Sequence, residues 1–519
     1  MPPKLCFSKC RKLTREECLK ESTMCQFIKT QGSKGSKGSK GSKGSKGSKG
    51  SKVQRRNYCR LNKLYTLDDK CNAIKKITKR ERKNAAKTTR KIAAKTISKF
   101  MIKTGNKRKS LFLKSICADS GVCLAFGTEI FKINQFFGNF KNFEYAVSPI
   151  KSIGSASSNG FVKEIKYQKE GYDAYSILKS STRQDADNLM YEYEVGQYIN
   201  KQNKIFPCFL ETYAAFVYKN SSAWNHVKDV NHILPHVLQN NLQILAKPDY
   251  SVGCFESTYI SIMIQHIKNA IGFNELNEMA LNQSGEHKII QMFNQEILGV
   301  LYQIYMPLAS MVNEFTHYDL HSGNVLLYEP VKNSYITYNY HLLSGEIVQF
   351  KSKYIAKIID YGRSYYDDKE NSSLKTYKKI CKNKDCDPRC GIEYGLEILG
   401  PESSPGSFYH ISSQVRNASH DLRISNGIVL PNKSFAEKIY LNDIVTRIVY
   451  KHTFGTKENM KTGGKYGPIN NVVDMSNALS NIINNPSYKN ENTDYYTAFK
   501  NIGEFHIFQD GRPMKFTNA

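Results

Sequence analysis

Two short strings in the second half of the chain place acidic and amide side chains directly beside apolar, strand-like runs. In residues 317–327, Asp319 and Asn324 lie five positions apart, and a Val-Leu-Leu run follows at once. In residues 357–362, an apolar run ends at Asp360 and a glycine, 41 residues beyond Asp319. Oxygen ligands at strand ends suit a divalent cation held on phosphates, and a further carboxylate suits an attacking hydroxyl. The two strings therefore predict a site for phosphoryl transfer.

These strings resemble the catalytic loop H-x-D-L-x-x-x-x-N and the D-F-G motif of the protein kinase-like superfamily. The resemblance implies an α+β, two-lobed protein-kinase-like fold, with an N-lobe of antiparallel sheet plus one helix and a mainly helical C-lobe. It also implies that Asp319 accepts or orients the proton of a substrate hydroxyl. Asn324 and Asp360 are expected to hold the Mg²⁺ (or Mn²⁺) ions that bridge the phosphates of ATP. His317 is expected to be structural.

The same resemblance implies a cationic side chain on an upstream strand. Residues 175–179, Tyr-Ser-Ile-Leu-Lys, resemble the V-A-I-K strand, so Lys179 is expected to contact the α- and β-phosphates of ATP. A helix is expected over residues 187–201, and Glu192 is our choice for the partner of Lys179. Glu194 is the alternative, and either acid could instead be a solvated helix residue.

The segment expected to cover the phosphates is residues 154–162. It resembles G-x-G-x-x-G-x-V only in its final Gly-x-Val and in its small residues, because the central glycine is missing. Gly154, Gly160 and Val162 are therefore the nucleotide-binding candidates there, and an ordinary turn is the alternative. Residues 262–267 are expected to form the strand that leads to the adenine-binding hinge.

Several further features concern the second half of the chain. Residues 400–402, Gly-Pro-Glu, resemble A-P-E, and Asp421 is expected to be the acid of the following helix. Tyr318 replaces the arginine that in many kinases binds an activation-loop phosphate. His321 replaces a lysine, which makes D-L-H-x-G-N closer to small-molecule phosphotransferases of the same fold. A hairpin is expected over residues 335–350.

Positive charge is concentrated in the first fifth of the chain. Of the chain's 75 Lys and Arg and 46 Asp and Glu, residues 1–110 hold 34 and 6, which leaves 41 and 40 for the rest. The formal charge of +29 therefore belongs to an N-terminal arm and says little about the partners of the body. Residues 75–109 favour a basic helix, which binds either nucleic acid or an anionic membrane surface, unless it is only a solvated tail.

The cysteine-containing segment at the start is interrupted by seven Gly-Ser-Lys repeats at residues 32–52, which predict a flexible linker. A small zinc or disulfide module is one interpretation of its cysteines and unpaired thiols are the other. For the three cysteines in the insertion between Asp360 and Glu402, a zinc site completed by a fourth ligand is one interpretation and incidental loop thiols are the other. The cysteines concerned are Cys6, Cys10, Cys18, Cys25, Cys59 and Cys71, and in the insertion Cys381, Cys386 and Cys390.

Targeting signals are not evident. No apolar signal region follows the initial Met-Pro-Pro-Lys, so we expect an intracellular protein that is not secreted. The most apolar stretch, residues 297–312, is expected to be a buried helix and not a membrane span. The predicted organisation is a cysteine-containing segment (1–71), a basic arm (72–110), a connector (111–144), an N-lobe with hinge (145–270) and a C-lobe (271–519).

Three functional hypotheses follow. The first is a serine/threonine protein kinase that uses Mg-ATP on protein substrates, because the repeat linker, basic arm and divergent motifs resemble such kinases of large DNA viruses. In that case the protein resides in the host cell or the virion. The second is a small-molecule or lipid kinase, for which Leu320-His321 is the motif. The third is a pseudokinase scaffold recruited through its basic arm.

Overall fold

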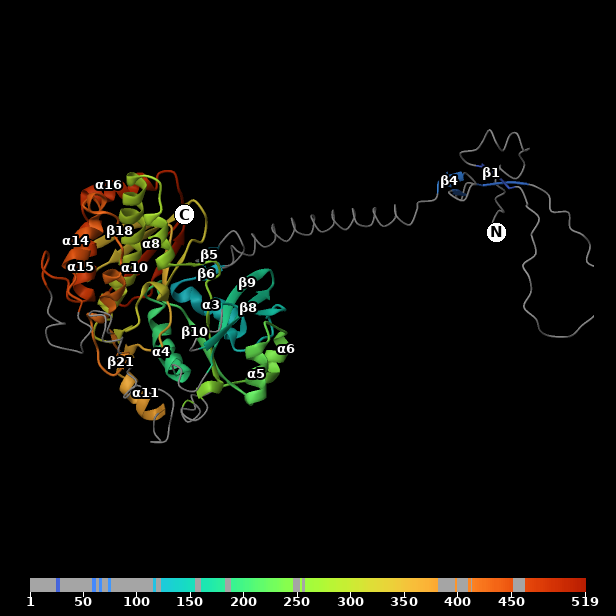
Figure 1. Ribbon diagram of the computed structural model, residues 1–519, viewed down its shortest axis with the longest axis horizontal. Coiled ribbons are helices and arrows are strands. Elements are labelled where there is room, and N and C mark those ends of the chain that lie inside the picture. The colour runs from blue at the N-terminus through green and yellow to red at the C-terminus, as the bar shows by residue number, and fades with distance from the viewer. Residues whose placement is uncertain are drawn as a thin grey trace, which may run out of the picture. The chain divides into compact units, whose positions relative to one another are not determined.

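Figure 1 shows the computed structural model of the chain, which divides into two compact units, Met1–Lys103 and Thr104–Ala519. The residues that the structure describes are 25–28, 58–61, 65–67, 73–75, 115–117, 123–154, 160–182, 188–245, 253, 257–380, 397–398, 409–411, 413–450 and 463–519.

In the first unit, the described residues form two short antiparallel strand pairs. Strand β1 (Cys25–Ile28) pairs with β2 (Tyr58–Leu61), and β3 (Tyr65–Leu67) pairs with β4 (Ala73–Lys75). The Gly-Ser-Lys repeats and the predicted basic helix after residue 75 lie outside the described residues. Apart from Cys25 in β1 and Cys59 in β2, the cysteines considered for zinc also lie outside the described residues.

The second unit contains a seven-stranded antiparallel sheet. Strands β8 and β9 alternate between buried and partly exposed positions, which is the pattern of a sheet covered differently on its two faces. Glu170 and Gly171, both with positive φ, form the tight turn between them. The sheet order is β11-β7-β8-β9-β13-β10-β12. The strand bounds are β7 Ile150–Ser152, β8 Gly160–Lys169, β9 Tyr172–Ser181, β10 Thr212–Tyr218, β11 His232–Ile233, β12 Leu242–Ile244 and β13 Ile260–Gln265.

One face of this sheet carries an aromatic-rich core that includes Phe161, Phe216 and Trp224. The helices and strands around the sheet are α3 (Ile130–Phe136), α5 (Ser221–Asp229) and α6 (Pro235–Asn241), with the strand pair β5 (Ser115–Cys117) and β6 (Cys123–Ala125) preceding α3. Phe137 and Phe140 also belong to this core, so the segment treated as a connector contributes to the sheet's packing.

Helix α4 (Leu189–Gln202) contacts strands β10 and β13 and belongs to the second, larger core. It begins two residues later than the predicted helix because Asn188 caps it, its side chain accepting hydrogen bonds from the backbone N–H groups of Met190 and Tyr191. Side chains alternate along β9, so Leu178 enters the aromatic core while Lys179 points to the α4 side of the sheet.

The larger core is centred on α10 (Leu298–Ser310), which confirms the predicted buried helix. A π-helical turn, η5 (Met292–Ile297), leads into it. Figure 1 shows α10, α14, α15 and α16 grouped together in the yellow-to-red part of the chain. None of the helices among the described residues is long and apolar enough to cross a membrane. The other helices are α8 Phe273–Leu281, α9 Glu286–Gln291, α11 Ser373–Ile380, α12 Arg423–Asn426, α13 Lys433–Ala436, α14 Tyr440–Arg447, α15 Val472–Ile483 and α16 Pro486–Tyr495.

The helical part also holds a four-stranded sheet of order β18-β17-β23-β24. The predicted hairpin is confirmed as β17 (Ser334–His341) and β18 (Ile347–Ser352), which pair antiparallel. Strand β23 (Lys500–Phe508) joins β17 in parallel, and β24 (Lys515–Asn518) forms the edge. A smaller sheet, β14-β16-β19, and the pair β15-β20 position the residues near Asp319 and Asp360. Their bounds are β14 Ile271–Gly272, β15 Phe315–Thr316, β16 Val325–Tyr328, β19 Ile355–Ile358 and β20 Tyr365–Tyr366.

The second unit thus mixes α-helices and β-strands, as expected of an α+β protein. Its large antiparallel sheet comes first along the chain, and helices predominate after it. The four-stranded sheet is larger than the hairpin expected from the sequence, because β23 and β24 come from the end of the chain.

Candidate active site

Lys179 lies at the centre of an ion-pair cluster that joins three separate segments. Its Nζ is 3.0 and 2.7 Å from the two carboxylate oxygens of Glu192 in α4, and 2.7 Å from Oδ1 of Asp360. The pairing of Lys179 with Glu192 is the one expected from the sequence. Glu194, the alternative partner, instead accepts a hydrogen bond from Asn371.

The charges of this cluster stabilise one another. Burial favours neutral Lys179, but Asp360 and Glu192 outweigh it and raise the pKa of the lysine above its ordinary value. Burial favours protonated Asp360, but Lys179 and Arg363 outweigh it and lower the pKa of Asp360 from 3.8 to about 2. The stabilisation from ionised Asp360 is therefore complete above its unfolded pKa of 3.8 and is lost as the pH falls towards 2.

The loop that carries Asp319 is held by a buried acid. Asp421, in the short helix η7 (His420–Leu422), accepts the backbone N–H of His317 at 2.8 Å and that of Tyr318 at 2.9 Å, one on each carboxylate oxygen. Tyr318 has a φ of 65°, a left-handed conformation that an aromatic residue rarely adopts. The two hydrogen bonds to Asp421 therefore hold the loop in a strained backbone turn immediately before Asp319.

His317 links this loop to the segment of Asp360. Its Nε2 is 2.9 Å from the carbonyl oxygen of Ile359, and its Nδ1 accepts the N–H of Asp319 at 3.3 Å. With Nδ1 accepting, Nε2 carries the proton and donates it. Burial lowers the pKa of His317, so the ring is neutral at pH 7. The histidine thus acts as a structural bridge, in agreement with the sequence analysis.

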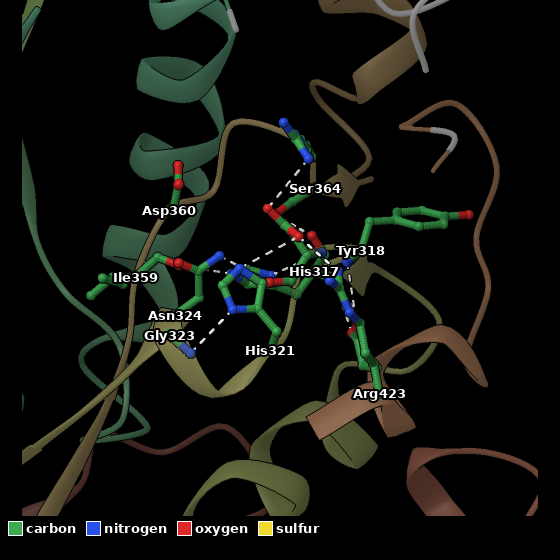
Figure 2. A network of polar contacts seen from close by, with 12 residues as sticks. His317, Tyr318, His321, Gly323, Asn324, Ile359, Asp360, Ser364 and Arg423 are labelled. Atoms are coloured by element: carbon green, nitrogen blue, oxygen red, sulfur yellow. Dashed lines mark hydrogen bonds and ion pairs between the residues drawn. The ribbon is translucent and has the colours of Figure 1, made fainter. Parts of the chain in front are cut away.

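Asn324 completes the connection between the two strings. Its Nδ2 donates to the carbonyl oxygen of Asp319 at 2.9 Å, and its own carbonyl oxygen accepts the N–H of Ile359 at 3.0 Å. Strands β16 and β19, which follow and precede these residues, pair antiparallel with Val325 opposite Ile358. Figure 2 shows His317, Asn324 and Asp360 on these adjoining segments. The two strings that are 41 residues apart in sequence are therefore neighbours in space.

The donor set of Asn324 and Asp360 fits a hard divalent cation. Because the amide nitrogen of Asn324 is committed to Asp319, its Oδ1 is the atom left for a cation, and the low pKa of Asp360 keeps that carboxylate ionised. Within the described residues, no three His, Cys, Asp or Glu side chains gather closely enough to hold a metal ion on their own. Magnesium characteristically takes one or two protein oxygens and completes its shell with phosphates and water.

The carboxylate of Asp319 lies close to two arginines and a histidine, and the sequence analysis missed these contacts. Arg423 Nη1 lies 2.8 Å from Oδ1, Arg363 Nη1 lies 3.5 Å from Oδ2, and His321 Nε2 lies 3.8 Å from Oδ1. Both arginines lie next to residues that carried the resemblance. Arg363 directly follows Gly362, and Arg423 lies two positions after Asp421. Their positions were visible in the sequence, but their convergence on Asp319 was not.

The predicted phosphate-covering segment is described only in part. Gly154 has a φ of 69°, and the residues between it and Gly160 lie outside the described residues. A Cβ on Gly160 would approach the carbonyl oxygen of Ser180 to 2.6 Å, so the β8–β9 pairing requires glycine there. Val162 lies opposite Lys179 in the same ladder, which places it beside the ion-pair cluster.

Of the remaining predicted features, some fall among the described residues and some do not. The strand expected before the hinge is β13, whose Ile262 pairs with Lys179 in the sheet. Residues 400–402, resembling A-P-E, and the three cysteines of the insertion lie outside the described residues.

Replacing Asp421 with asparagine is expected to destabilise the second unit. Asparagine offers one acceptor oxygen, so one of the two buried N–H groups of His317 and Tyr318 loses its partner, at a cost of about 1–3 kcal/mol. Denaturant unfolding of the full-length chain measures this loss. Asp443→Asn is the control, because the Asp443 side chain is 70% exposed and its pair with Arg447 contributes little. Equal stability of the two variants would contradict the role given to Asp421.

No protein-family model matches this sequence. A search of curated proteins found no significant relative.

Proposed function

We propose that this chain is an ATP-dependent phosphotransferase with a two-lobed protein-kinase-like fold, and that it transfers the γ-phosphate of Mg-ATP to Ser or Thr hydroxyls of proteins. The observation that carries the proposal is one continuous network. Lys179 contacts Glu192 and Asp360, and backbone bonds from Ile359 lead on to the loop in which Asn324 contacts Asp319. Residues from four distant segments thus supply a cation, two oxygen ligands and a separate carboxylate at one place.

The proposed roles follow from the chemistry of each group. Lys179, held by Glu192 and Asp360, provides the positive charge that phosphate oxygens require. Asn324 and Asp360 would hold the divalent cation, which neutralises charge on the transferring phosphate. Glu192 keeps Lys179 oriented and charged, since its side chain is only 4% exposed and lies within hydrogen-bond distance.

Asp319 receives the proton in the proposed reaction. The substrate hydroxyl oxygen forms a bond to the γ-phosphorus, the bond from that phosphorus to the bridging oxygen of ADP breaks, and the hydroxyl proton passes to the Asp319 carboxylate. The Asp319 loop has the rigidity for this role, because Asp421 fixes its backbone and Asn324 fixes the Asp319 carbonyl.

The acceptor is tested by offering labelled Mg-ATP and the full-length chain a mixture of proteins and, separately, a panel of small hydroxylated metabolites and lipids. Label on protein Ser or Thr is the expected result. Label on a metabolite or lipid would select the second hypothesis, a small-molecule or lipid kinase with His321 at the acceptor site. Absence of any transfer, together with absence of Mg-ATP binding, would favour the scaffold.

The basic arm is proposed to bring the chain to a polyanion, either nucleic acid or an anionic membrane surface. Deleting residues 1–110 is expected to leave phosphotransfer within about twofold of the full chain and to remove salt-sensitive binding, because the rest of the chain is close to neutral. Binding to duplex DNA and to phosphatidylserine vesicles, each at low and high salt, measures this. Undiminished binding by the truncated chain would refute the assignment to the arm.

A further inference from the structure

Two histidines from distant parts of the chain meet on the outer face of the four-stranded sheet. His341 is the last residue of β17, and His506 lies in β23, 165 positions later. The Nε2 atom of His341 is 3.2 Å from Nδ1 of His506. Phe505 and Ile507, the neighbours of His506 along β23, are buried in the larger core. Because side chains alternate along a strand, the two histidines lie on the opposite, partly exposed face.

Glu504 favours one protonation state of the His506 ring. Its Oε2 is 3.7 Å from Nε2 of His506, and the carboxylate attracts the ring proton to that nitrogen. Nδ1 of His506 then carries a lone pair on the side that faces His341. Among the residues that the structure describes, Nδ1 of His341 has no hydrogen-bond partner, so this ring is able to carry its proton there and leave Nε2 unprotonated. Two nitrogen lone pairs are thus available side by side.

The spacing of these two nitrogens matches that of two ligands on one metal ion. Zn–N bonds of about 2.0–2.1 Å in a tetrahedral arrangement place two nitrogens about 3.3–3.4 Å apart. The observed 3.2 Å lies within about 0.2 Å of that spacing. The His341 ring stacks on Phe508 with 4.7 Å between the centroids, which limits its orientations. The His506 side chain is 34% exposed, so an ion has access to the pair from solvent.

The charges around the pair do not oppose a cation. Burial is the largest effect that lowers the pKa of His341, so its ring is neutral at pH 7, as a metal ligand must be. The nearby Arg512 is neutralised by Asp510, because its Nε lies 3.0 and 2.8 Å from the two carboxylate oxygens. Glu504 balances Lys515, which is exposed on the neighbouring strand β24. The formal charges of these four groups therefore sum to zero.

We propose that His341 and His506 bind one Zn²⁺ or a divalent transition-metal ion of similar ligand preference, that Glu504 holds His506 in the ligating tautomer, and that the ion fastens β23 to β17. Imidazole nitrogens suit Zn²⁺, Ni²⁺ and Cu²⁺, whereas Mg²⁺ favours oxygen. Water would complete the coordination shell, since the described residues offer no group of three His, Cys, Asp or Glu side chains there. This inference is independent of the proposed phosphotransfer.

Zinc binding by the full-length chain is the first test. The chelator-treated protein is titrated with ZnCl₂ by isothermal titration calorimetry in the presence of excess MgCl₂. The wild-type chain is expected to bind one equivalent of Zn²⁺ more than His341→Gln or His506→Gln, because each variant keeps only one ligand of the pair. Zinc held by the cysteine-containing segments would be the same in all the chains, so the difference reports on this pair alone.

Two further variants sharpen the titration. Glu504→Gln is expected to weaken the affinity for this equivalent by about tenfold or more, because the amide no longer attracts the proton of His506 to Nε2. His287→Gln is the matched control and should bind as many equivalents as the wild-type chain, since His287 is exposed and has no ring partner among the described residues.

Thermal unfolding gives a second readout. Zn²⁺ should stabilise the folded chain, because the two ligands come together only when β23 pairs with β17. Saturating ZnCl₂ is therefore expected to raise the unfolding midpoint of the wild-type chain more than that of His341→Gln, and chelator should abolish the difference. Without zinc, the two chains should unfold within about 1 °C of each other, because His341 is a surface residue.

Equal zinc stoichiometry in the wild-type chain and in both variants of the pair would overturn the inference, and the pair would then be an ordinary hydrogen bond between two histidines. Loss of the same equivalent in His287→Gln would equally contradict the assignment. An affinity that does not change in Glu504→Gln would refute the role given to that acid.

Discussion

Replacing Lys179 with methionine is expected to lower kcat/KM for phosphate transfer by about 10²–10³-fold. The change removes the cation that both Glu192 and Asp360 contact, so the site loses its positive charge for phosphate oxygens. It also leaves two neighbouring carboxylates without a shared partner, and removal of one member of such a partly buried cluster costs roughly 3 kcal/mol of unfolding free energy. Steady-state kinetics and denaturant unfolding measure the two effects.

Lys201→Met is the matched control. It is the same substitution, and Lys201 also forms an ion pair at 2.7 Å, with Asp368, but its side chain is 58% exposed. Exposed pairs contribute at most about 1 kcal/mol, so this variant should keep near wild-type kinetics and stability. If both variants lose activity to the same extent, the loss at Lys179 does not report on a phosphate-binding cation.

Asp319→Asn is expected to reduce kcat by about 10²–10⁴-fold and to change the affinity for Mg-ATP little. The amide has nearly the same shape but cannot take the hydroxyl proton. The Asp319 carboxylate pairs with Arg363 and Arg423, whereas Lys179 pairs with Glu192 and Asp360. Steady-state kinetics and nucleotide titration separate the effect on kcat from the effect on Mg-ATP affinity.

Asp173→Asn serves as the control for that variant. The Asp173 side chain is 16% exposed, an exposed fraction similar to the 13% of Asp319. It pairs with Lys166 at 2.7 Å in the β8–β9 hairpin, away from the network. The kcat of the Asp173→Asn variant should match that of the wild-type chain. Transfer undiminished in Asp319→Asn would remove Asp319 from the proton-accepting role.

Local patterns in the sequence predicted those parts of the molecule that depend on nearby residues. The buried helix α10 was predicted from its apolar run, and the β17–β18 hairpin and helix α4 were predicted from local residue patterns. Glu192 was chosen over Glu194 as the partner of Lys179, and in the structure the Glu192 carboxylate lies 2.7 Å from Lys179 Nζ. Asp319, Asn324 and Asp360 were identified from their motif, and the structure brings their segments together.

Contacts between distant segments were not predictable in this way. Arg423 meets Asp319 across 104 positions, and β17 pairs with β23 at the end of the chain. Such contacts depend on how helices and sheets pack, and residue periodicity does not predict them. The anchoring of the 317–318 backbone by Asp421 is a third example, since the sequence placed that acid in a helix without showing which N–H groups it accepts.

The most direct test of the central claim is phosphoamino acid analysis of a protein acceptor incubated with γ-labelled Mg-ATP and the full-length chain, with Asp319→Asn in parallel. The proposed function predicts phosphoserine or phosphothreonine with the wild-type chain and a loss of at least about a hundredfold with the variant. Equal label with both chains, or no label with a wild-type chain that also fails to bind Mg-ATP, would contradict it.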